Sequence, residues 1–186
     1  MKLYIKNMVS IRCKMTVQQK LNQLGLHNFT VDLGEVDIQE GLTPQQRDRL
    51  NVLLLKSGLE LIYDKRAVLI ERIKNVVVEL VHYSEETLKI KNSEYISKKL
   101  NHDYTYLANV FSESEGTTIE HYIIAHKVER VKELLLYAEL NLTEISYKLN
   151  YSSVAHLSSQ FKKVTGLSPT VYKQLQINQR KTLENV

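Results

Sequence analysis

Residues 141–174 read NLTEISYKLNYSSVAHLSSQFKKVTGLSPTVYKQ, and this stretch decides the fold of the C-terminal half. It predicts a short helix, a polar turn, a second helix, a glycine stop and a third helix that begins at Ser168-Pro169. Two helices joined by a tight turn form a helix-turn-helix, whose second helix can enter the major groove of DNA. On spacing alone, a helical hairpin whose polar face meets only water fits equally well.

Small polar residues mark the ends of these helices. Thr143 is the expected N-cap of the first helix, and Asn150 is expected to take the left-handed conformation that ends it. Either Ser152 or Ser153 caps the second helix. Apolar residues recur there at three- and four-residue spacing. The buried face is therefore expected to hold Val154, Leu157, Phe161 and Val164.

The opposite face of the second helix is small, polar and basic. Ala155, Ser158 and Ser159 are short enough to let the helix backbone approach base edges. Lys162 and Lys163 can contact phosphates. The composition of this face favours a helix that reads DNA.

The same rules predict another helix-turn-helix upstream. Ser93 caps a helix that ends at the turn Asn101-His102-Asp103, and a recognition helix follows from Tyr104 to Glu115. Gly116 ends that helix, and an amphipathic helix from Ile119 to Glu139 connects the two motifs. The residues expected to be buried in the first recognition helix are Leu107, Val110 and Phe111.

Residues 85–175 resemble the DNA-binding domain of AraC-type transcription regulators, which holds two helix-turn-helix motifs joined by a long helix. The matching residues are Arg130, Leu134-Leu135, Ile145, Tyr147, Tyr151, Phe161-Lys162-Lys163, Gly166, Ser168-Pro169 and Tyr172. The resemblance implies sequence-specific binding to double-stranded DNA and contact with RNA polymerase. The groove-facing residues that it implies are Tyr104, Thr105, Ala108 and Asn109 in the first motif and Ser153, Val154, Ala155, Ser158 and Ser159 in the second. For Tyr104 and Tyr106, packing on the protein surface is the alternative to base contact.

The two motifs differ in charge. Residues 85–142 hold 7 lysines and arginines against 10 acidic residues, a net charge of −3. Residues 143–182 hold 6 against 1, a net charge of +5. Members of the resembled family often carry Lys-Lys where Ser112-Glu113 stands here, and Arg at the positions of Asn109 and Ser159. Because phosphate neutralisation supplies much of the affinity for a duplex, we expect the second motif to anchor the protein.

The first 64 residues predict a separate α+β domain with the element order β-α-β-β-α-β, the ferredoxin-like split unit. Its expected elements are a strand at Lys2–Val9, a helix at Arg12–Gly25, a hairpin of Phe29–Leu33 and Val36–Ile38, a helix from Thr43-Pro44 to Gly58, and a strand at Leu59–Tyr63. The predicted fold class is therefore an α+β N-terminal domain followed by an all-α double helix-turn-helix domain.

The first strand-to-helix loop, Met8 to Cys13, resembles that of heavy-metal-associated domains, which reads Met-x-Cys-x-x-Cys. Ser10 stands in place of the first cysteine, and a hydroxyl is a poor ligand for a soft metal ion. Cys13 is therefore a weak metal candidate, and an unliganded cysteine in a retained fold is the alternative. The corresponding alternative function is a soft-metal-binding or metal-responsive protein, with the C-terminal half as an interaction module. We predict no cofactor.

Residues 65–84 predict a helix that links the domains, and residues 176–186 form a polar tail. The wide apolar stripe of the linking helix needs a partner, either within the chain or in a homodimer. No run of 18 apolar residues occurs, and the single cysteine fits a reducing compartment, so we expect a cytoplasmic protein with no membrane contact. No phosphate loop, nucleophile elbow or His/Glu zinc motif is present, so no enzyme is expected.

Overall fold

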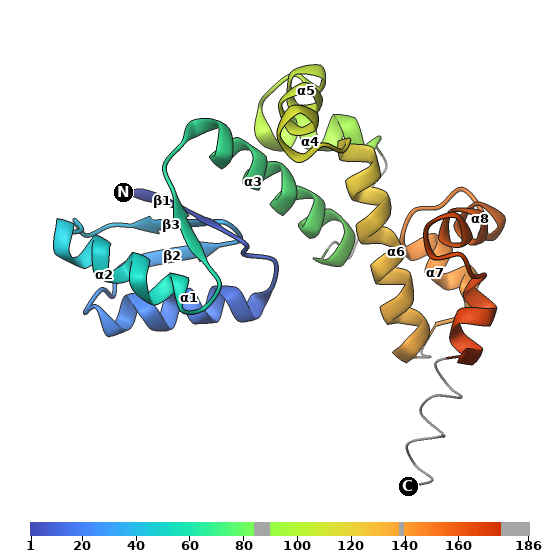
Figure 1. Ribbon diagram of the computed structural model, residues 1–186, viewed down its shortest axis with the longest axis horizontal. Coiled ribbons are helices and arrows are strands. Elements are labelled where there is room, and N and C mark those ends of the chain that lie inside the picture. Colours follow the sequence, from blue (N-terminus) through green and yellow to red (C-terminus); the bar gives the residue numbers. More distant parts are fainter. Residues whose placement is uncertain (84–89, 138–139, 176–186) are drawn as a thin grey trace, which may run out of the picture. The chain divides into compact units, whose positions relative to one another are not determined.

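The computed structural model describes residues 1–83, 90–137 and 140–175 (Figure 1). The chain divides into two compact domains, Met1–Val76 and a second that begins at Val77. The predicted α+β class is confirmed, because a four-stranded sheet with helices is followed by helices alone.

The first domain has the predicted element order. Its elements are β1 (Lys2–Lys6), α1 (Ile11–Gln23), β2 (Phe29–Asp32), β3 (Glu35–Ile38), α2 (Pro44–Leu55) and β4 (Glu60–Ile62). The sheet order is β2-β3-β1-β4, and every neighbouring pair is antiparallel. Each helix thus joins two parallel strands that are split by a third, which is the topology that the ferredoxin-like prediction requires. The first strand ends before the predicted Val9, because Asn7 has a φ of 68° that breaks the extended backbone.

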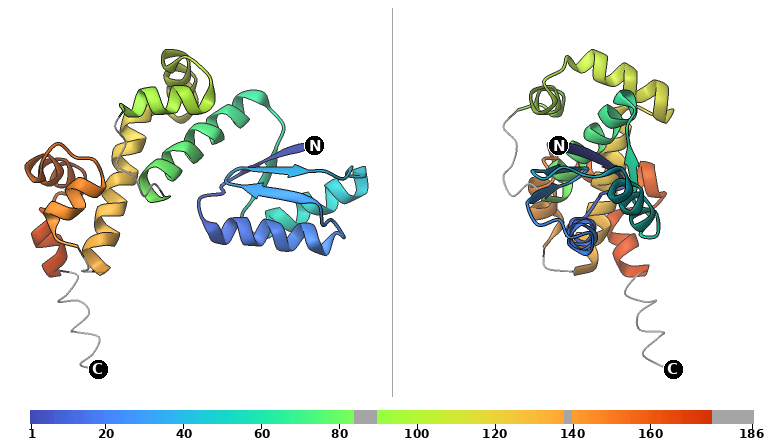
Figure 2. Two further views of the ribbon diagram at one scale, coloured as in Figure 1. Left: turned by 180° about the vertical axis from the view of Figure 1, so that it is seen from behind. Right: turned by 90° about the vertical axis from the view of Figure 1, so that its left-hand side faces the viewer.

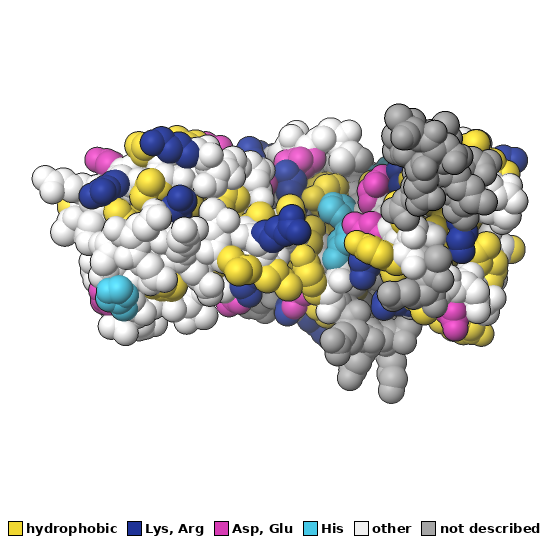
Figure 3. Space-filling view, turned by 90° about the horizontal axis from the view of Figure 1, so that it is seen from below, with side chains coloured by type: hydrophobic (Ala, Val, Ile, Leu, Met, Phe, Trp, Pro, Cys, Tyr) yellow, Lys and Arg dark blue, Asp and Glu magenta, His cyan; other side chains and the backbone are white. Residues whose placement is uncertain are grey.

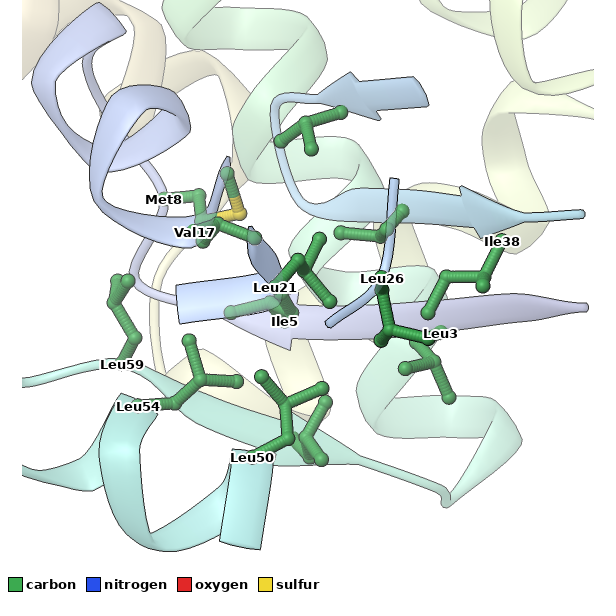
Figure 4. Packing of buried hydrophobic residues seen from close by; sticks show 13 residues of the cluster. Leu3, Ile5, Met8, Val17, Leu21, Leu26, Ile38, Leu50, Leu54 and Leu59 are labelled. Carbon is green, nitrogen blue, oxygen red and sulfur yellow. The ribbon is translucent and has the colours of Figure 1, made fainter. Parts of the chain in front are cut away.

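Both helices of the first domain cover one face of its sheet (Figure 1). Figure 4 shows their apolar side chains pointing into a shared core, where Leu21 of α1 and Leu54 of α2 approach Ile5 of β1. These three side chains have no exposed surface. Thr43 caps α2 through a capping box with Gln46, as the Thr-Pro pair predicts.

The linking helix begins at the predicted place but is divided between the two domains. Its α-helical part is α3 (Lys65–Val78), and a π-helical turn follows at Glu79–Tyr83. The buried carboxylate of Glu71 accepts a hydrogen bond from the backbone N–H of Asn7, at 3.3 Å. Asn75 lies so close to Gly34 that a Cβ there would come within 1.9 Å of its side-chain nitrogen. The first compact domain therefore includes most of α3.

The second domain consists of helices (Figure 2). They are α4 (Asn92–Leu100), α5 (Tyr104–Glu115), α6 (Ile119–Tyr137), α7 (Leu142–Lys148) and α8 (Val154–Thr165), and residues 169–175 are also helical. The predicted connecting helix is α6, although its expected end at Glu139 lies outside the described residues. All elements of the two predicted helix-turn-helix motifs are present.

Three local predictions about this domain are wrong. Ser93 does not cap α4, which begins one residue earlier after Lys91 and has no side-chain cap. Asn141 rather than Thr143 caps α7, because Asn141 and Glu144 form a reciprocal capping box. Val164 is 50% exposed, since it lies at the end of α8, beyond the reach of the core that buries Leu157.

Candidate nucleic-acid interface

The second helix-turn-helix is held by a turn and an apolar core. Asn150 has a φ of 54°, and the following Tyr151 N–H donates to the carbonyl of Ser146 at 2.9 Å, which closes α7. Ser153 then caps α8 by accepting the His156 N–H at 3.1 Å. Fully buried side chains hold the two helices against α6, namely Val128, Val131, Ile145, Leu157 and Phe161.

The outer face of α8 presents the predicted contact residues. Ala155, Ser159, Lys162 and Lys163 are exposed, as is the capping residue Ser153. Val154 and Ser158 are half-buried at the edges of this face. Neither lysine forms an ion pair with any residue in the described part of the chain. Their charges are therefore not neutralised there, and they follow the small residues along the same helix.

His156 also lies on this face, as the sequence predicts, although it is not among the predicted contact residues. Its Nδ1 lies 3.0 Å from the hydroxyl of Ser152, and its ring stands edge-on to Tyr151 with centroids 5.3 Å apart. The polar turn before α8 is thus ordered by side chains as well as by its cap. The run Ser152-Ser153 was the only sequence signal for this arrangement.

The first helix-turn-helix has the same backbone plan. Asn101 has a φ of 54°, and Asp103 caps α5 by accepting the N–H groups of Thr105 and Tyr106 at 2.8 and 3.3 Å. Leu107 and Phe111 are fully buried, as predicted, whereas Val110 is only half-buried.

The exposed face of α5 differs from that of α8. Thr105 and Asn109 are exposed, and Ala108 is half-buried. The last turn carries the exposed acids Glu113 and Glu115 where α8 carries two lysines. Negative charge at this end repels phosphates, so the polar residues of the first turns are the part of α5 suited to DNA.

Tyr104 is tied to the connecting helix. Its hydroxyl donates a hydrogen bond to the carboxylate of Glu120, and its side chain is half-buried. Burial, together with this carboxylate, raises the pKa of Tyr104 well above its ordinary value. Of the two interpretations of Tyr104, this contact favours packing. Tyr106 is exposed, and its ring lies 5.6 Å from that of His102.

Known proteins resemble the second domain. Residues 96–175 match the family described as a helix-turn-helix domain. This part of the chain is an AraC-type DNA-binding domain. The C-terminal domain of AraT, a response regulator from Geobacillus stearothermophilus, superimposes with a TM-score of 0.51 and 26% identity, covering 60% of this chain and 88% of that one.

Two curated relatives of this AraC-type domain are regulators of operons. The Msm operon regulatory protein of Streptococcus mutans is 32% identical over 105 residues, which are 52% of this chain and 38% of that protein. The F1 operon positive regulatory protein of Yersinia pestis is 32% identical over 101 residues, which are 53% of this chain and 34% of that protein. The chain therefore spans only about a third of the length of these relatives.

The predicted metal candidate is part of a helix cap. Ser10 accepts the N–H of Cys13 at 3.4 Å and caps α1, and its hydroxyl lies 3.3 Å from the Cys13 thiol. Burial raises the pKa of this thiol, but hydrogen bonds from Ser10 and nearby backbone amides outweigh it, so the net change is a lowering. The described residues hold no group of three or more histidine, cysteine and acidic side chains that could bind a metal ion. Nothing in this loop supports the metal-binding alternative.

Two further properties bear on the setting of the interface. No helix in the described ranges is both long and apolar enough to cross a membrane. On the face shown in Figure 3, lysine and arginine side chains are dispersed rather than gathered in one strip. The net charge of the whole chain is only +4, which is compatible with DNA binding but does not by itself indicate it.

Proposed function

We propose that this chain is a sequence-specific transcription regulator that inserts α5 and α8 into successive major-groove segments of double-stranded DNA. The observation that carries this proposal is the exposed face of α8, where small residues are followed by Lys162 and Lys163, which have no ion-pair partner among residues 1–83, 90–137 and 140–175. Short side chains permit close approach to bases, and the lysines supply phosphate contacts. The second motif is the anchor, because α5 ends in acids.

The groove contacts that we propose are residues of the first turns of each recognition helix. They are Thr105 and Asn109 in the first motif and Ser153, Val154, Ala155, Ser158 and Ser159 in the second. Tyr104 instead holds α5 against α6 through its hydrogen bond to Glu120 and does not contact a base.

The wider biology follows from the same proposal. One relative is named as a positive regulator, which supports activation by this chain. We propose contact with RNA polymerase as the route of that activation. A regulator of this kind works in the cytoplasm and needs no catalytic site. The apolar stripe of the linking helix is buried within the chain, with Ile73 and Val77 fully covered, so we propose that it is not a homodimer interface.

The test is the salt dependence of duplex binding. Each phosphate contact contributes about −0.9 to the slope of log affinity against log salt concentration. Replacing Lys162 and Lys163 by alanine should therefore make the slope shallower by about 1.8, with similar weakening on every sequence. A matched control replaces Lys98 and Lys99, which are paired with Glu94 and Glu79, and should change the slope little. Equal slopes for both double variants would contradict an anchoring role for α8.

Selection of bound duplexes from a random pool tests the number of half-sites. Two conserved segments about 10 base pairs apart, centre to centre, are expected if both recognition helices read bases. A single segment would leave α8 as the reader and assign α5 a supporting role.

A further inference from the structure

A cleft of about 370 Å³ opens within the second domain, between its two helix-turn-helix motifs. That volume is within the lower range of small-molecule sites. Its lining comes from the starts of α4 and α5, the first half of α6, the turn before α8 and α8 as far as Gln160. Its lining residues include Glu120, Ile123, Ile124, Lys127, Tyr151 and Gln160.

Lys127 is the cation of this cleft, and no carboxylate of the described residues pairs with it. Its Nζ lies 4.9 Å from the centre of the Tyr151 ring, and it makes no ion pair within the described residues. Burial lowers its pKa, which is the direction for a cation that has lost water without gaining an anion. The acid of the cleft, Glu120, is seven residues away, or about 10 Å along α6, and accepts the hydroxyl of Tyr104.

Hydrogen-bond donors of Tyr151 and Gln160 line the same cleft as Lys127. The Tyr151 hydroxyl is 2.8 Å from Oε1 of Gln160 and donates to it, and burial raises its pKa to about 12, so this hydroxyl stays protonated. With its oxygen engaged in this way, Gln160 keeps two amide N–H donors for another partner. The cleft therefore offers an ammonium and an amide that both suit an anionic oxygen.

The remainder of the lining is apolar. Ile123 is 4% exposed, Ile124 is half-buried, and Tyr151, at 8% exposed, presents its ring to the same space. A backbone phosphate of DNA has no apolar part that would use these surfaces. An aromatic or aliphatic acid has both an anion and an apolar body.

We propose that the cleft binds a small organic anion, with its carboxylate or phosphate at Lys127 and Gln160 and its apolar body against Ile123, Ile124 and Tyr151. Because Tyr151 and Tyr104 border the starts of α8 and α5, an occupant would brace both recognition helices. That consequence rests on the proposed function, whereas binding to the free protein does not.

The experiment titrates the full-length, ¹⁵N-labelled chain without DNA, using 2-naphthoate as the anionic probe and neutral 2-naphthamide as its isostere. We expect 2-naphthoate to shift the backbone amides of Lys127, Tyr151 and Gln160, and the amide probe to bind at least tenfold more weakly. Lys127→Gln should weaken naphthoate binding at least tenfold, because the variant loses the charge-assisted hydrogen bond to the anion. Lys132→Gln is the control, because Lys132 is on the same helix but paired with Glu129 outside the cleft.

Several results would overturn the proposal. They are equal binding of both probes, unchanged binding by Lys127→Gln in a chain whose spectrum is otherwise intact, or shifts confined to other residues. Inorganic phosphate binding as tightly as naphthoate would reduce the cleft to a counterion site. If only a duplex shifts the Lys127 amide, the cation contacts the DNA backbone and the organic anion is excluded. Because DNA is absent from the main titration, failure there leaves the DNA-binding proposal standing.

Discussion

In both helix-turn-helix motifs, an asparagine with a φ of 54° precedes a recognition helix of 12 residues that ends at a glycine. Each recognition helix buries a leucine and a phenylalanine four residues apart, Leu107 with Phe111 and Leu157 with Phe161. The last turns differ, because α5 ends in Ser-Glu-Ser-Glu and α8 carries Lys162-Lys163. The two motifs thus share the same packing and turn geometry, whereas the exposed charges that govern phosphate affinity differ between them.

The largest expected effect tests the shared part of the two motifs. Phe111→Ala and Phe161→Ala should each lower the free energy of unfolding of the second domain by about 3–5 kcal/mol, because both rings are fully buried. Urea denaturation followed by circular dichroism measures this loss. The control Val164→Ala should change stability by less than about 0.5 kcal/mol, since that side chain is half exposed. A small loss for one phenylalanine alone would show that the two cores are not equivalent.

The next effect concerns the difference in charge. Replacing both Ser112 and Glu113 by lysine should steepen the salt slope of duplex binding by about 1.8, because two phosphate contacts are added. Over a fourfold change in salt, that slope corresponds to about a tenfold change in affinity. Fluorescence anisotropy with a labelled duplex measures it. An unchanged slope would mean that the end of α5 does not reach the backbone.

The caps of the two recognition helices should matter equally. Asp103→Ala and Ser153→Ala each remove a side chain that accepts N–H groups of the first turn. Each should cost about 1 kcal/mol of stability in thermal or urea unfolding. Retaining the acceptor, as in Asp103→Asn or Ser153→Thr, should restore most of it. A loss at Asp103 alone would indicate that the turn before α8 is held by other side chains, such as His156 and Ser152.

The smallest expected effect is a pH dependence confined to the first motif. His82 Nε2 and His126 Nδ1 lie 3.2 Å apart, and the Tyr122 ring lies between His126 and Phe111, with centroids 4.5 and 5.5 Å away. Burial lowers the pKa of both histidines, and the charge of His82 lowers that of His126 further. The carboxylate of Glu133 acts in the opposite direction by raising the pKa of His82, and the carboxylate of Glu129 likewise raises the pKa of His126.

The direction of this pH dependence follows from a comparison with the unfolded chain, in which a histidine has its ordinary pKa near 6.5. The stability contributed by the neutral pair is full above that pH and is lost as pH falls through the lowered folded values. Amide protection factors in α5, which correct for the intrinsic pH dependence of exchange, should therefore fall as the pH is lowered from 7.5 to 5.5, while those in α8 change less. His126→Gln should reduce this dependence, whereas His156→Gln, in the exposed first turn of α8, should not. Equal acid sensitivity of both helices would exclude the pair as its cause.

Local sequence signals predicted the helices of the second motif more reliably than their exact ends. The periodicity of α8 and the punctuation by Asn150 and Gly166 led to the correct helices, because these signals act within a few residues. The predicted caps Ser93 and Thr143 were wrong, because several small polar residues near each helix start could serve as the cap. At α7, Asn141 is the cap because it forms a reciprocal capping box with Glu144. Which exposed residues contact bases stays a prediction.

The sequence by itself determined the succession of a β-α-β-β-α-β domain and a double helix-turn-helix, together with the contrast in charge between the two motifs. Periodicity, turn residues and charge are local properties that can be read along the chain. Only the tertiary structure decided that Tyr104 bonds to Glu120, that His82 meets His126, and that Lys127 lines a cleft with Tyr151 and Gln160. These contacts join residues distant in the chain, and which side chains meet there depends on helix packing, which no local pattern specifies.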